Sequence, residues 1–405
     1  MAANEQSSAR RIEQPQLAPG RLMRHIDSLT SLRFFAAFAV LLHHMQFMQT
    51  SSDPDVRALY SVFHEGLSGV QFFYILSGFI ICYSFSARQR EGRAAFSYFL
   101  YCRAARLFPL HWLTLAASIV MFHPWDGQAV YLIRLLANLS LLHAWSTDVF
   151  TYFSFNGVSW SISVEMFFYL SFCLLVGLPT RVLVFILTAI VAVVFIQLQT
   201  PQPDGTVGLW LFYVNPVMRL ADFLAGMIVY RAFVSHRWAI PAYAVTAAEI
   251  ASIAGIGLCV FLAPMVAGQL GLDLYYVPSM ALAIFVFAHG TGSISRALSW
   301  PPLVLLGNAS FALYMVHQMV IARYLQWQFD TYGTNQVIDN WGALQILAIT
   351  GTIAIALAIA LHLLFEKPTE RFLRKMWKAR PHGTSAQSAP ERLLETPLAI
   401  TPIAG

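Results

Sequence analysis

The segment RHIDSLTSLRFFAAFAVLLHHMQFM, residues 24–48, combines a long apolar run with ionisable side chains near both ends. Arg33 lies in its first part, and His43 and His44 stand together in its last part. The apolar run predicts a membrane-spanning helix, and ionisable groups inside a membrane are costly and usually face an internal cavity. The rest of the chain is therefore expected to form a helical bundle around this segment.

Helical geometry predicts how these side chains lie relative to one another. Eleven residues separate Arg33 from His44, which is roughly three turns plus about 20°, or on the order of 16 Å. His43 is rotated away from Arg33 by about 80°. The spacing predicts one helix face with a cation near one membrane surface and an imidazole near the other. The alternative is that either histidine only caps or hydrogen-bonds a neighbouring helix.

The composition is that of an integral membrane protein. The chain has 405 residues, of which 58% are hydrophobic and 11% charged, whereas soluble domains carry about 25% charged residues. The formal net charge of +5 comes from arginines and lysines clustered in loops, which indicates membrane topology and not nucleic-acid binding. The four cysteines show no paired spacing, so neither a disulfide framework nor a zinc site is predicted.

Ten apolar runs approach the roughly 20 residues that a membrane-spanning helix needs. They are residues 31–50, 67–86, 105–122, 157–178, 182–198, 208–230, 240–262, 272–290, 302–325 and 342–364. The run 130–146 is shorter and contains Arg134, so we interpret it as a re-entrant or interfacial helix. The predicted fold is an all-α polytopic membrane bundle of about ten transmembrane helices.

The loop charges predict that both termini are cytoplasmic in a multi-pass protein of the plasma membrane. With this topology the inner loops receive most of the loop arginines, namely Arg88, Arg90, Arg93, Arg103, Arg106, Arg181, Arg231, Arg237 and Arg296. Residues 1–24 and 379–405 are polar and are expected to be disordered cytoplasmic tails. Residues 25–378 form the predicted membrane domain.

Four groups of polar residues interrupt the apolar runs. Arg103 and Arg106 stand at i and i+3, a spacing that suits bidentate binding of a phosphate, although a positive-inside anchor is the alternative. Glu165 follows Trp160 and Ser161 inside an apolar segment, where it either acts in chemistry or pairs with an arginine such as Arg33 or Arg219. A further pair, Arg219 and Asp222, is interpreted as a structural ion pair. Ser310, Tyr314 and His317 form a polar stripe that faces the bundle interior or a water-filled pocket.

Several of these segments together resemble acyltransferase family 3, a family of membrane-bound acyltransferases. The matching pieces, in the family's order, are IDSLTSLRFFAAFAVLLHH, GLSGVQFFYILSGF, RAAR, WSISVEMFFYL, GNASFALYMVH and FEKP, within residues 26–368. The chain shows no Walker loop, GxSxG elbow or HExxH motif that would favour other enzyme classes.

The resemblance implies an acyl-CoA co-substrate bound from the cytoplasmic side, with no bound cofactor and no metal. It also implies an essential histidine late in the first span, which by register is His44. The phosphate-binding pair maps onto Arg103 and Arg106, and the motif carboxylate maps onto Glu165. We add Arg33 to the donor site. The residues assigned to the acceptor or cavity lining are Ser77, Trp160, Ser161, Tyr314 and His317.

These assignments predict transfer of an acyl group, in the first instance acetyl, to a hydroxyl of a carbohydrate or other acceptor. His44 would act as the general base, with Glu165 or another polar neighbour orienting the imidazole. A covalent acyl-histidine intermediate is an open alternative for the mechanism. The alternative function is a transporter or flippase of a lipid-linked sugar or small solute, although the sequence shows no internal repeat.

Overall fold

The computed structural model describes residues 26–90, 95–122, 127–200, 205–235, 240–266, 274–333 and 340–378. Within these ranges every regular element is a helix, and no strand is present. The predicted all-α class is therefore confirmed. The two predicted disordered tails, residues 1–24 and 379–405, lie outside the described residues.

The helices run almost without interruption along the described chain. Those of the first half are α1 (Asp27–His43), η1 (Gln46–Thr50), α2 (Pro54–His64), η2 (Glu65–Ser68), α3 (Gly69–Arg90), α4 (Phe96–Phe122), α5 (Gln128–Leu139), η3 (His143–Trp145), α6 (Val149–Tyr152), η4 (Gly157–Ser159), α7 (Trp160–Leu175) and α8 (Thr180–Leu198). Those of the second half are α9 (Gly205–Leu209), η5 (Trp210–Val214), α10 (Pro216–Ser235), α11 (Ala242–Val266), α12 (Val277–Phe287), α13 (Ser293–Leu298), α14 (Pro301–Asn308), α15 (Ser310–Tyr332), α16 (Asn340–Leu361), η7 (His362–Glu366) and α17 (Lys367–Lys378).

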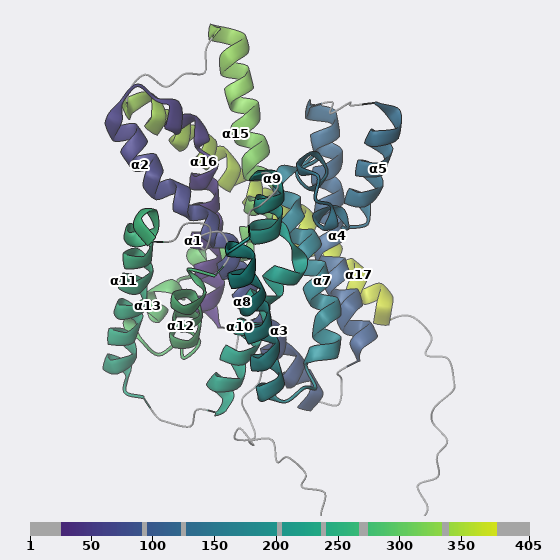
Figure 1. Ribbon diagram of the computed structural model, residues 1–405, viewed down its shortest axis with the longest axis vertical. Coiled ribbons are helices and arrows are strands. Elements are labelled where there is room, and N and C mark those ends of the chain that lie inside the picture. Colours follow the sequence, from purple (N-terminus) through teal and green to yellow (C-terminus); the bar gives the residue numbers. More distant parts are fainter. Residues whose placement is uncertain are drawn as a thin grey trace, which may run out of the picture.

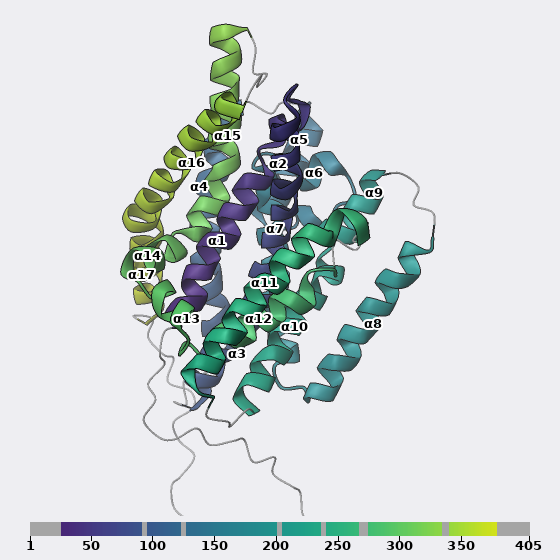
Figure 2. The ribbon, with the colours of Figure 1, turned by 90° about the vertical axis from the view of Figure 1, so that its left-hand side faces the viewer.

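The helix α1 lies at the centre of the bundle, as the sequence predicted. It packs against α2, α3, α12, α13, α14 and α15, which come from both halves of the chain (Figures 1 and 2). Hydrogen bonds tie its first turn to the second half, because Ser28 Oγ donates to the carbonyl of Phe287 and Ser31 Oγ to that of Leu298. Arg33, His43 and His44 therefore lie on a segment that other helices surround.

Two glycines allow α3 and α10 to pack in direct backbone contact. A side chain at Gly78 would collide with the carbonyl oxygen of Phe223, and one at Gly226 would collide with that of Ile75. Small residues at such crossings are the usual way for membrane helices to approach closely. Gly78 in the second span therefore serves close packing of the helices.

Eight of the ten predicted spans agree with helices that are long and apolar enough to cross a membrane. Seven such helices occur in the described residues, and an eighth span consists of α14 and α15 with a bend of 63° between them. The predicted spans 208–230 and 272–290 do not meet this test. The first contains the charged residues of α10, and the second provides only the 11-residue α12. The short α5, also apolar, agrees with the segment that we interpreted as re-entrant or interfacial.

The predicted boundaries are wrong at three places. The helix α1 ends at His43, and His44 is its C-cap, so the first span continues as a 3₁₀-helix. The helix α4 begins at Phe96, nine residues before the predicted start of its span at 105. The prediction missed these residues because the first turns of the helix are polar and aromatic. The last span extends through Trp377 because α16 continues through η7 into α17.

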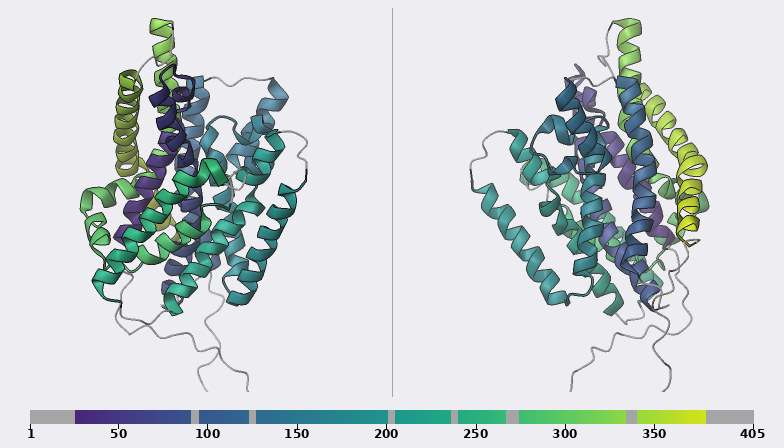
Figure 3. Two further views of the ribbon diagram at one scale, coloured as in Figure 1. Left: turned by 60° about the vertical axis from the view of Figure 1, so that its left-hand side comes forward. Right: turned by 90° about the vertical axis from the view of Figure 1, so that its right-hand side faces the viewer.

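The helix ends gather at two opposite ends of the bundle. The ends of α3 and α10 and the start of α8 lie at one end, whereas α2, α5 and the end of α15 lie at the other (Figures 1 and 2). The helix α8 lies at the periphery, where it packs mainly on α10 and exposes apolar side chains (Figure 3). The predicted inner loops after α3, before α8 and after α10 therefore share one side of the molecule.

Candidate active site

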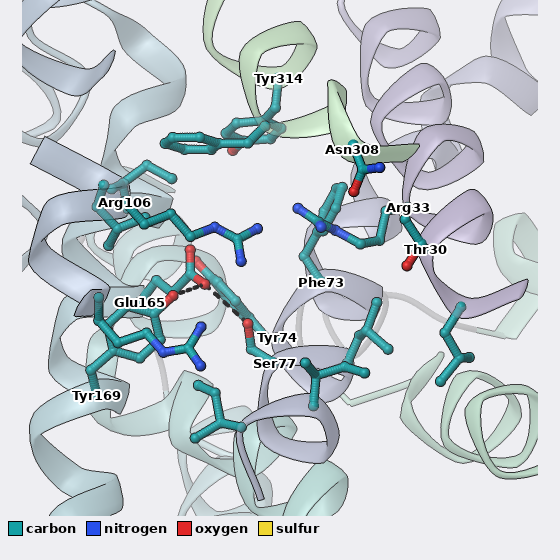
Figure 4. A pocket seen from close by; sticks show the side chains of 18 of the residues that line it. Thr30, Arg33, Phe73, Tyr74, Ser77, Arg106, Glu165, Tyr169, Asn308 and Tyr314 are labelled. Carbon is teal, nitrogen blue, oxygen red and sulfur yellow. Dashed lines mark hydrogen bonds between the residues drawn. The ribbon is translucent and has the colours of Figure 1, made fainter. Parts of the chain in front are cut away.

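A cavity of about 420 Å³ lies between α1, α3, α4, α7 and α15 and is lined by three arginines. Arg33 comes from α1, and Arg103 and Arg106 come from α4. In Figure 4, Arg33 and Arg106 point into this space from opposite sides, and Tyr314 lies across one end of it. We call it the arginine cavity. Its volume lies within the range of about 300–1,000 Å³ that is typical of small-molecule sites.

The arginines of this cavity have few protein partners. Among the described residues, Arg33 and Arg106 form neither a hydrogen bond nor an ion pair within 4.0 Å. Arg103 donates a long hydrogen bond of 3.4 Å from Nη2 to Ser84 Oγ and lies over the rings of Phe99 and Tyr169. Guanidinium groups that face a cavity without a carboxylate in contact are suited to bind an anionic ligand.

Glu165 lies in the arginine cavity and is held by two hydroxyl groups. Ser77 Oγ donates to its Oε1 over 3.0 Å, and Tyr169 Oη donates to the same oxygen (Figure 4). The expectation that Glu165 orients His44 is not met, because both partners of this carboxylate lie in the arginine cavity. Tyr169 was missed in the sequence, although it stands four residues after Glu165 on the same helix face.

Acidic residues from the end of the chain complete the arginine cavity, and the sequence analysis assigned none of them to a site. Glu366 and Glu370 line it together with His362, whose Nδ1 lies 3.0 Å from Glu366 Oε2. Glu366 belongs to the FEKP segment, which was the one available signal. With Glu165, the lining of the cavity therefore contains three arginines and three glutamates.

A second cavity, of about 490 Å³, contains the two adjacent histidines. We call it the histidine cavity. His43 and His44 line it at the end of α1, and its other walls are largely aromatic or amide side chains, including Phe122, Phe153, Phe155, Asn156, Trp160, Tyr213 and Gln318. Its lining contains none of the three arginines. The structure thus separates Arg33 from His44, which the helical spacing had placed along one face.

His44 forms a hydrogen-bonded pair with His317. The Nδ1 atom of His44 lies 2.9 Å from the carbonyl oxygen of Val40 and 3.2 Å from Nε2 of His317. A carbonyl can only accept, so His44 carries its proton on Nδ1 and its Nε2 is unprotonated in the neutral ring. His317 places its Nδ1 3.1 Å from the carbonyl of Leu313, so its Nε2 lone pair faces His44. His317 is fully buried, and it supports His44 without lining either cavity.

His43 lies in the same cavity but has different partners. Its Nδ1 is 2.8 Å from the carbonyl of His64, and its ring packs edge-on against those of His44 and His64. The predicted rotation of His43 away from the functional face is therefore not what distinguishes the two histidines. The distinguishing feature is a hydrogen bond with His317, which His44 forms and His43 does not.

The remaining predicted residues lie at the boundary between the two cavities. Trp160 lines the histidine cavity and Ser161 the arginine cavity, whereas Tyr314 lines both. The backbone carbonyl of Val158 accepts hydrogen bonds from Tyr314 Oη at 3.1 Å and from Ser161 Oγ at 3.0 Å. Val70 is the other residue that both cavities share.

The predicted structural ion pair is confirmed. Arg219 Nη1 lies 3.2 Å from Asp222 Oδ2, and both side chains are fully buried in α10 outside both cavities. Among the described residues, no three histidine, cysteine, aspartate or glutamate side chains gather in a way that suits a metal ion.

The comparisons with known proteins agree with this architecture. The family model described as an acyltransferase domain matches residues 26–363, which is most of the chain. The chain belongs to acyltransferase family 3. It is 30% identical over 401 residues to acyltransferase MdmB of Streptomyces mycarofaciens, an alignment that covers 92% of this chain and 97% of that protein. This acyltransferase is therefore a multi-pass membrane enzyme that transfers acyl groups.

Two further relatives of the acyltransferase are similar over shorter alignments. The exopolysaccharide production protein ExoZ of Rhizobium meliloti is 28% identical over 269 residues, 64% of this chain and 78% of that protein. The putative peptidoglycan O-acetyltransferase YrhL of Bacillus subtilis is 24% identical over 326 residues, 74% of this chain and 49% of that protein. The chain thus spans about half the length of YrhL. No solved structure matches it.

Proposed function

We propose that this acyltransferase moves an acyl group from acyl-CoA, held in the arginine cavity, to an acceptor hydroxyl in the histidine cavity. The observation that carries the proposal is the set of three cavity-facing guanidiniums, Arg33, Arg103 and Arg106, with no carboxylate within 4.0 Å among the described residues. A donor with several phosphates matches this set, because guanidinium groups bind phosphate oxygens in bidentate fashion.

The histidine cavity supports the acceptor half of the reaction. His44 Nε2 has no hydrogen-bond partner among the described residues, and its proton on Nδ1 leaves the Nε2 lone pair available to take a proton. Histidine is the side chain best suited to proton transfer near neutral pH. The aromatic walls of this cavity suit a carbohydrate or another hydroxyl compound with an apolar face.

The reaction then follows from these two groups. His44 Nε2 takes the proton of the acceptor hydroxyl while the acceptor oxygen attacks the thioester carbonyl carbon. The carbon–sulfur bond of the tetrahedral intermediate breaks, and the leaving thiolate takes the proton back from His44. The products are an O-acyl ester and free CoA, and the histidine returns to its neutral state. His317 accepts the Nδ1 proton of His44 in a hydrogen bond and so favours the imidazolium that forms transiently.

The names of the relatives favour acetyl as the acyl group and a glycan as the acceptor, since YrhL is named a putative peptidoglycan O-acetyltransferase. The loop charges favour a plasma-membrane location with the arginine cavity open to the cytoplasm, where acyl-CoA is made. No bound cofactor or metal takes part in the proposed reaction.

The test is turnover of radiolabelled acetyl-CoA by the purified enzyme with a panel of hexoses, polysaccharides and small secondary alcohols. We expect free CoA and labelled ester in equal amounts. Arg103→Lys and Arg106→Lys keep the charge but lose the planar fork, so each should raise the KM for acetyl-CoA several-fold. Arg106→Ala should raise it roughly tenfold to a hundredfold, because a hydrogen bond to a charged group contributes about 1.5–3 kcal/mol.

Arg181→Lys is the matched control, since Arg181 is exposed at the start of α8 and lines neither cavity. It should leave the KM for acetyl-CoA unchanged. A protein that releases no CoA from acetyl-CoA but moves a lipid-linked sugar or solute across vesicles would be a transporter, and the proposal would be wrong. Mass spectrometry of the intact protein after incubation without acceptor distinguishes a covalent acyl-His44 intermediate from direct transfer.

A further inference from the structure

The arginine cavity and the histidine cavity are separate spaces with two lining residues in common. Among the described residues, only Val70 of α3 and Tyr314 of α15 line both of them. Along α1, Arg33 and His44 are eleven residues apart, roughly 16 Å at 1.5 Å per residue. A donor whose phosphates contact Arg33 therefore has to extend past Val70 and Tyr314 before its thioester reaches His44.

Both of these side chains are buried. Val70 is 2% exposed and Tyr314 is 5% exposed. The hydroxyl of Tyr314 donates to the carbonyl of Val158 over 3.1 Å, and its ring packs against Phe73 at 6.2 Å between centroids. On the other side, the Tyr314 ring lies 5.8 Å from the ring of His317, the partner of His44. Tyr314 thus connects the arginine cavity to the histidine pair.

We infer that Val70 and Tyr314 form the constriction through which the acyl end of the donor reaches His44, and that the side chain of Val70 limits the length of the acyl group. This inference rests on the proposed function. The pantetheine arm of CoA is a long unbranched chain that can pass such a gap, whereas the acyl group at its end has to fit between these two side chains. An acyl chain longer by one or two methylenes meets the γ-methyl groups of Val70.

The size of position 70 should therefore set the preference among acyl donors. Val70→Ala removes two methyl groups and should raise the ratio of kcat/KM for butyryl-CoA to that for acetyl-CoA about tenfold, since one methylene in an apolar pocket changes kcat/KM by about 10–200-fold. Val70→Ile adds one methylene to the side chain and should lower the same ratio. The inhibition constant of free CoA as a product inhibitor should stay unchanged, because Arg33, Arg103 and Arg106 are untouched.

The experiment measures CoA release from acetyl-, propionyl- and butyryl-CoA with methyl glucoside as the hydroxyl probe, in both variants and in Val164→Ala. Val164 is a fully buried valine of α7 that lines neither cavity, so it controls for the loss of core volume. It should leave the donor ratio unchanged. Val70→Ile keeps the core filled and reports on the constriction even where Val70→Ala lowers the yield of folded protein.

Opposite shifts of the donor ratio in the two variants would support the constriction. An unchanged ratio in both, in an enzyme whose arginine variants lose affinity for acetyl-CoA, would overturn this inference and leave the proposed function standing. A change in the KM for methyl glucoside alone would mean that the acceptor and not the donor passes Val70, and would also overturn it. Arginine variants with unchanged donor affinity would instead contradict the proposed function.

Discussion

Nε2 of His317 lies 3.2 Å from Nδ1 of His44, although 273 residues separate the two histidines in the chain. His317 belongs to α15 and is fully buried, whereas His44 caps α1 and lines the histidine cavity. The carbonyls of Leu313 and Val40 fix the protonated nitrogen of each ring. The contact therefore directs the unprotonated Nε2 of His44 away from the protein partners of the ring, as a general base requires.

This contact predicts different effects for two substitutions of His317. His317→Gln keeps a hydrogen-bond acceptor for His44, whereas His317→Phe fills the ring volume without one. We expect kcat to fall about 10–100-fold in His317→Phe, the cost of a misplaced catalytic group, and clearly less in His317→Gln. The KM values for donor and acceptor should hardly change, since His317 lines neither cavity. Steady-state kinetics on both variants test this. A packing role would give the reverse order, with His317→Phe the more active.

The two adjacent histidines provide the second prediction. His44→Ala should lower acyl transfer by about 10²–10⁴-fold, the usual contribution of a general base, while the protein still inserts into the membrane. His43→Phe should keep most of the activity, because His43 forms no hydrogen bond with His317 in the described part of the chain. Acceptor acylation is measured for both variants side by side and normalised to folded protein. An active His44→Ala enzyme, or an inactive His43→Phe enzyme at equal abundance, would assign the base to another residue.

The fold could be predicted from the sequence to a large extent, because a membrane-spanning helix requires a continuous run of apolar residues. The errors have physical reasons. The first turns of α4 carry Tyr98 and Arg103, which resemble loop residues in the sequence. Both side chains are nevertheless half-buried, and α4 packs against α7 and α17. The bend between α14 and α15 at Ala309 contains no proline, so the sequence did not predict it.

The candidate site could be predicted as a set of residues but not as an arrangement. The arginine pair, Glu165 and His44 were each identified from local spacing or motif register. Their grouping depends on contacts such as Ser77 with Glu165, which are 88 residues apart, and His44 with His317. No periodicity within one helix contains that information. As a result, Glu165 was assigned to the wrong neighbour, and the separation into two cavities could not be foreseen.

The buried ion pair of α10 provides a prediction on stability. Arg219→Met leaves the fully buried carboxylate of Asp222 without this cation and should cost about 3–5 kcal/mol. The double variant Arg219→Met/Asp222→Leu removes both charges and should recover much of the lost stability, because it leaves no buried charge uncompensated. Thermal unfolding in detergent measures both. Equal destabilisation of the single and double variants would show that the pair acts through other contacts of these side chains.

The arrangement of helix ends provides the last prediction, which concerns topology. The ends of α3 and α10 and the start of α8 lie on one side of the bundle, opposite the end of α15 (Figures 1 and 2). Arginines are concentrated in the predicted inner loops, so the positive-inside rule places the α3 side in the cytoplasm. We expect single cysteines at the exposed positions Gln89 and Lys375 to react only after the membrane is permeabilised, and one at Thr331 to react in intact cells.

The labelling is done with a membrane-impermeant maleimide in a variant whose native cysteines, Cys82, Cys102, Cys173 and Cys259, are replaced by serine or alanine. Acyl-transfer activity of the cysteine-free protein is the control for its fold. Labelling of the Lys375 cysteine in intact cells would place the end of α17 outside. Glu366 at the end of η7 and Glu370 in the first turn of α17 line the arginine cavity. This result would therefore also open the cavity away from the cytoplasm and remove the supply of acyl-CoA on which the proposed reaction depends.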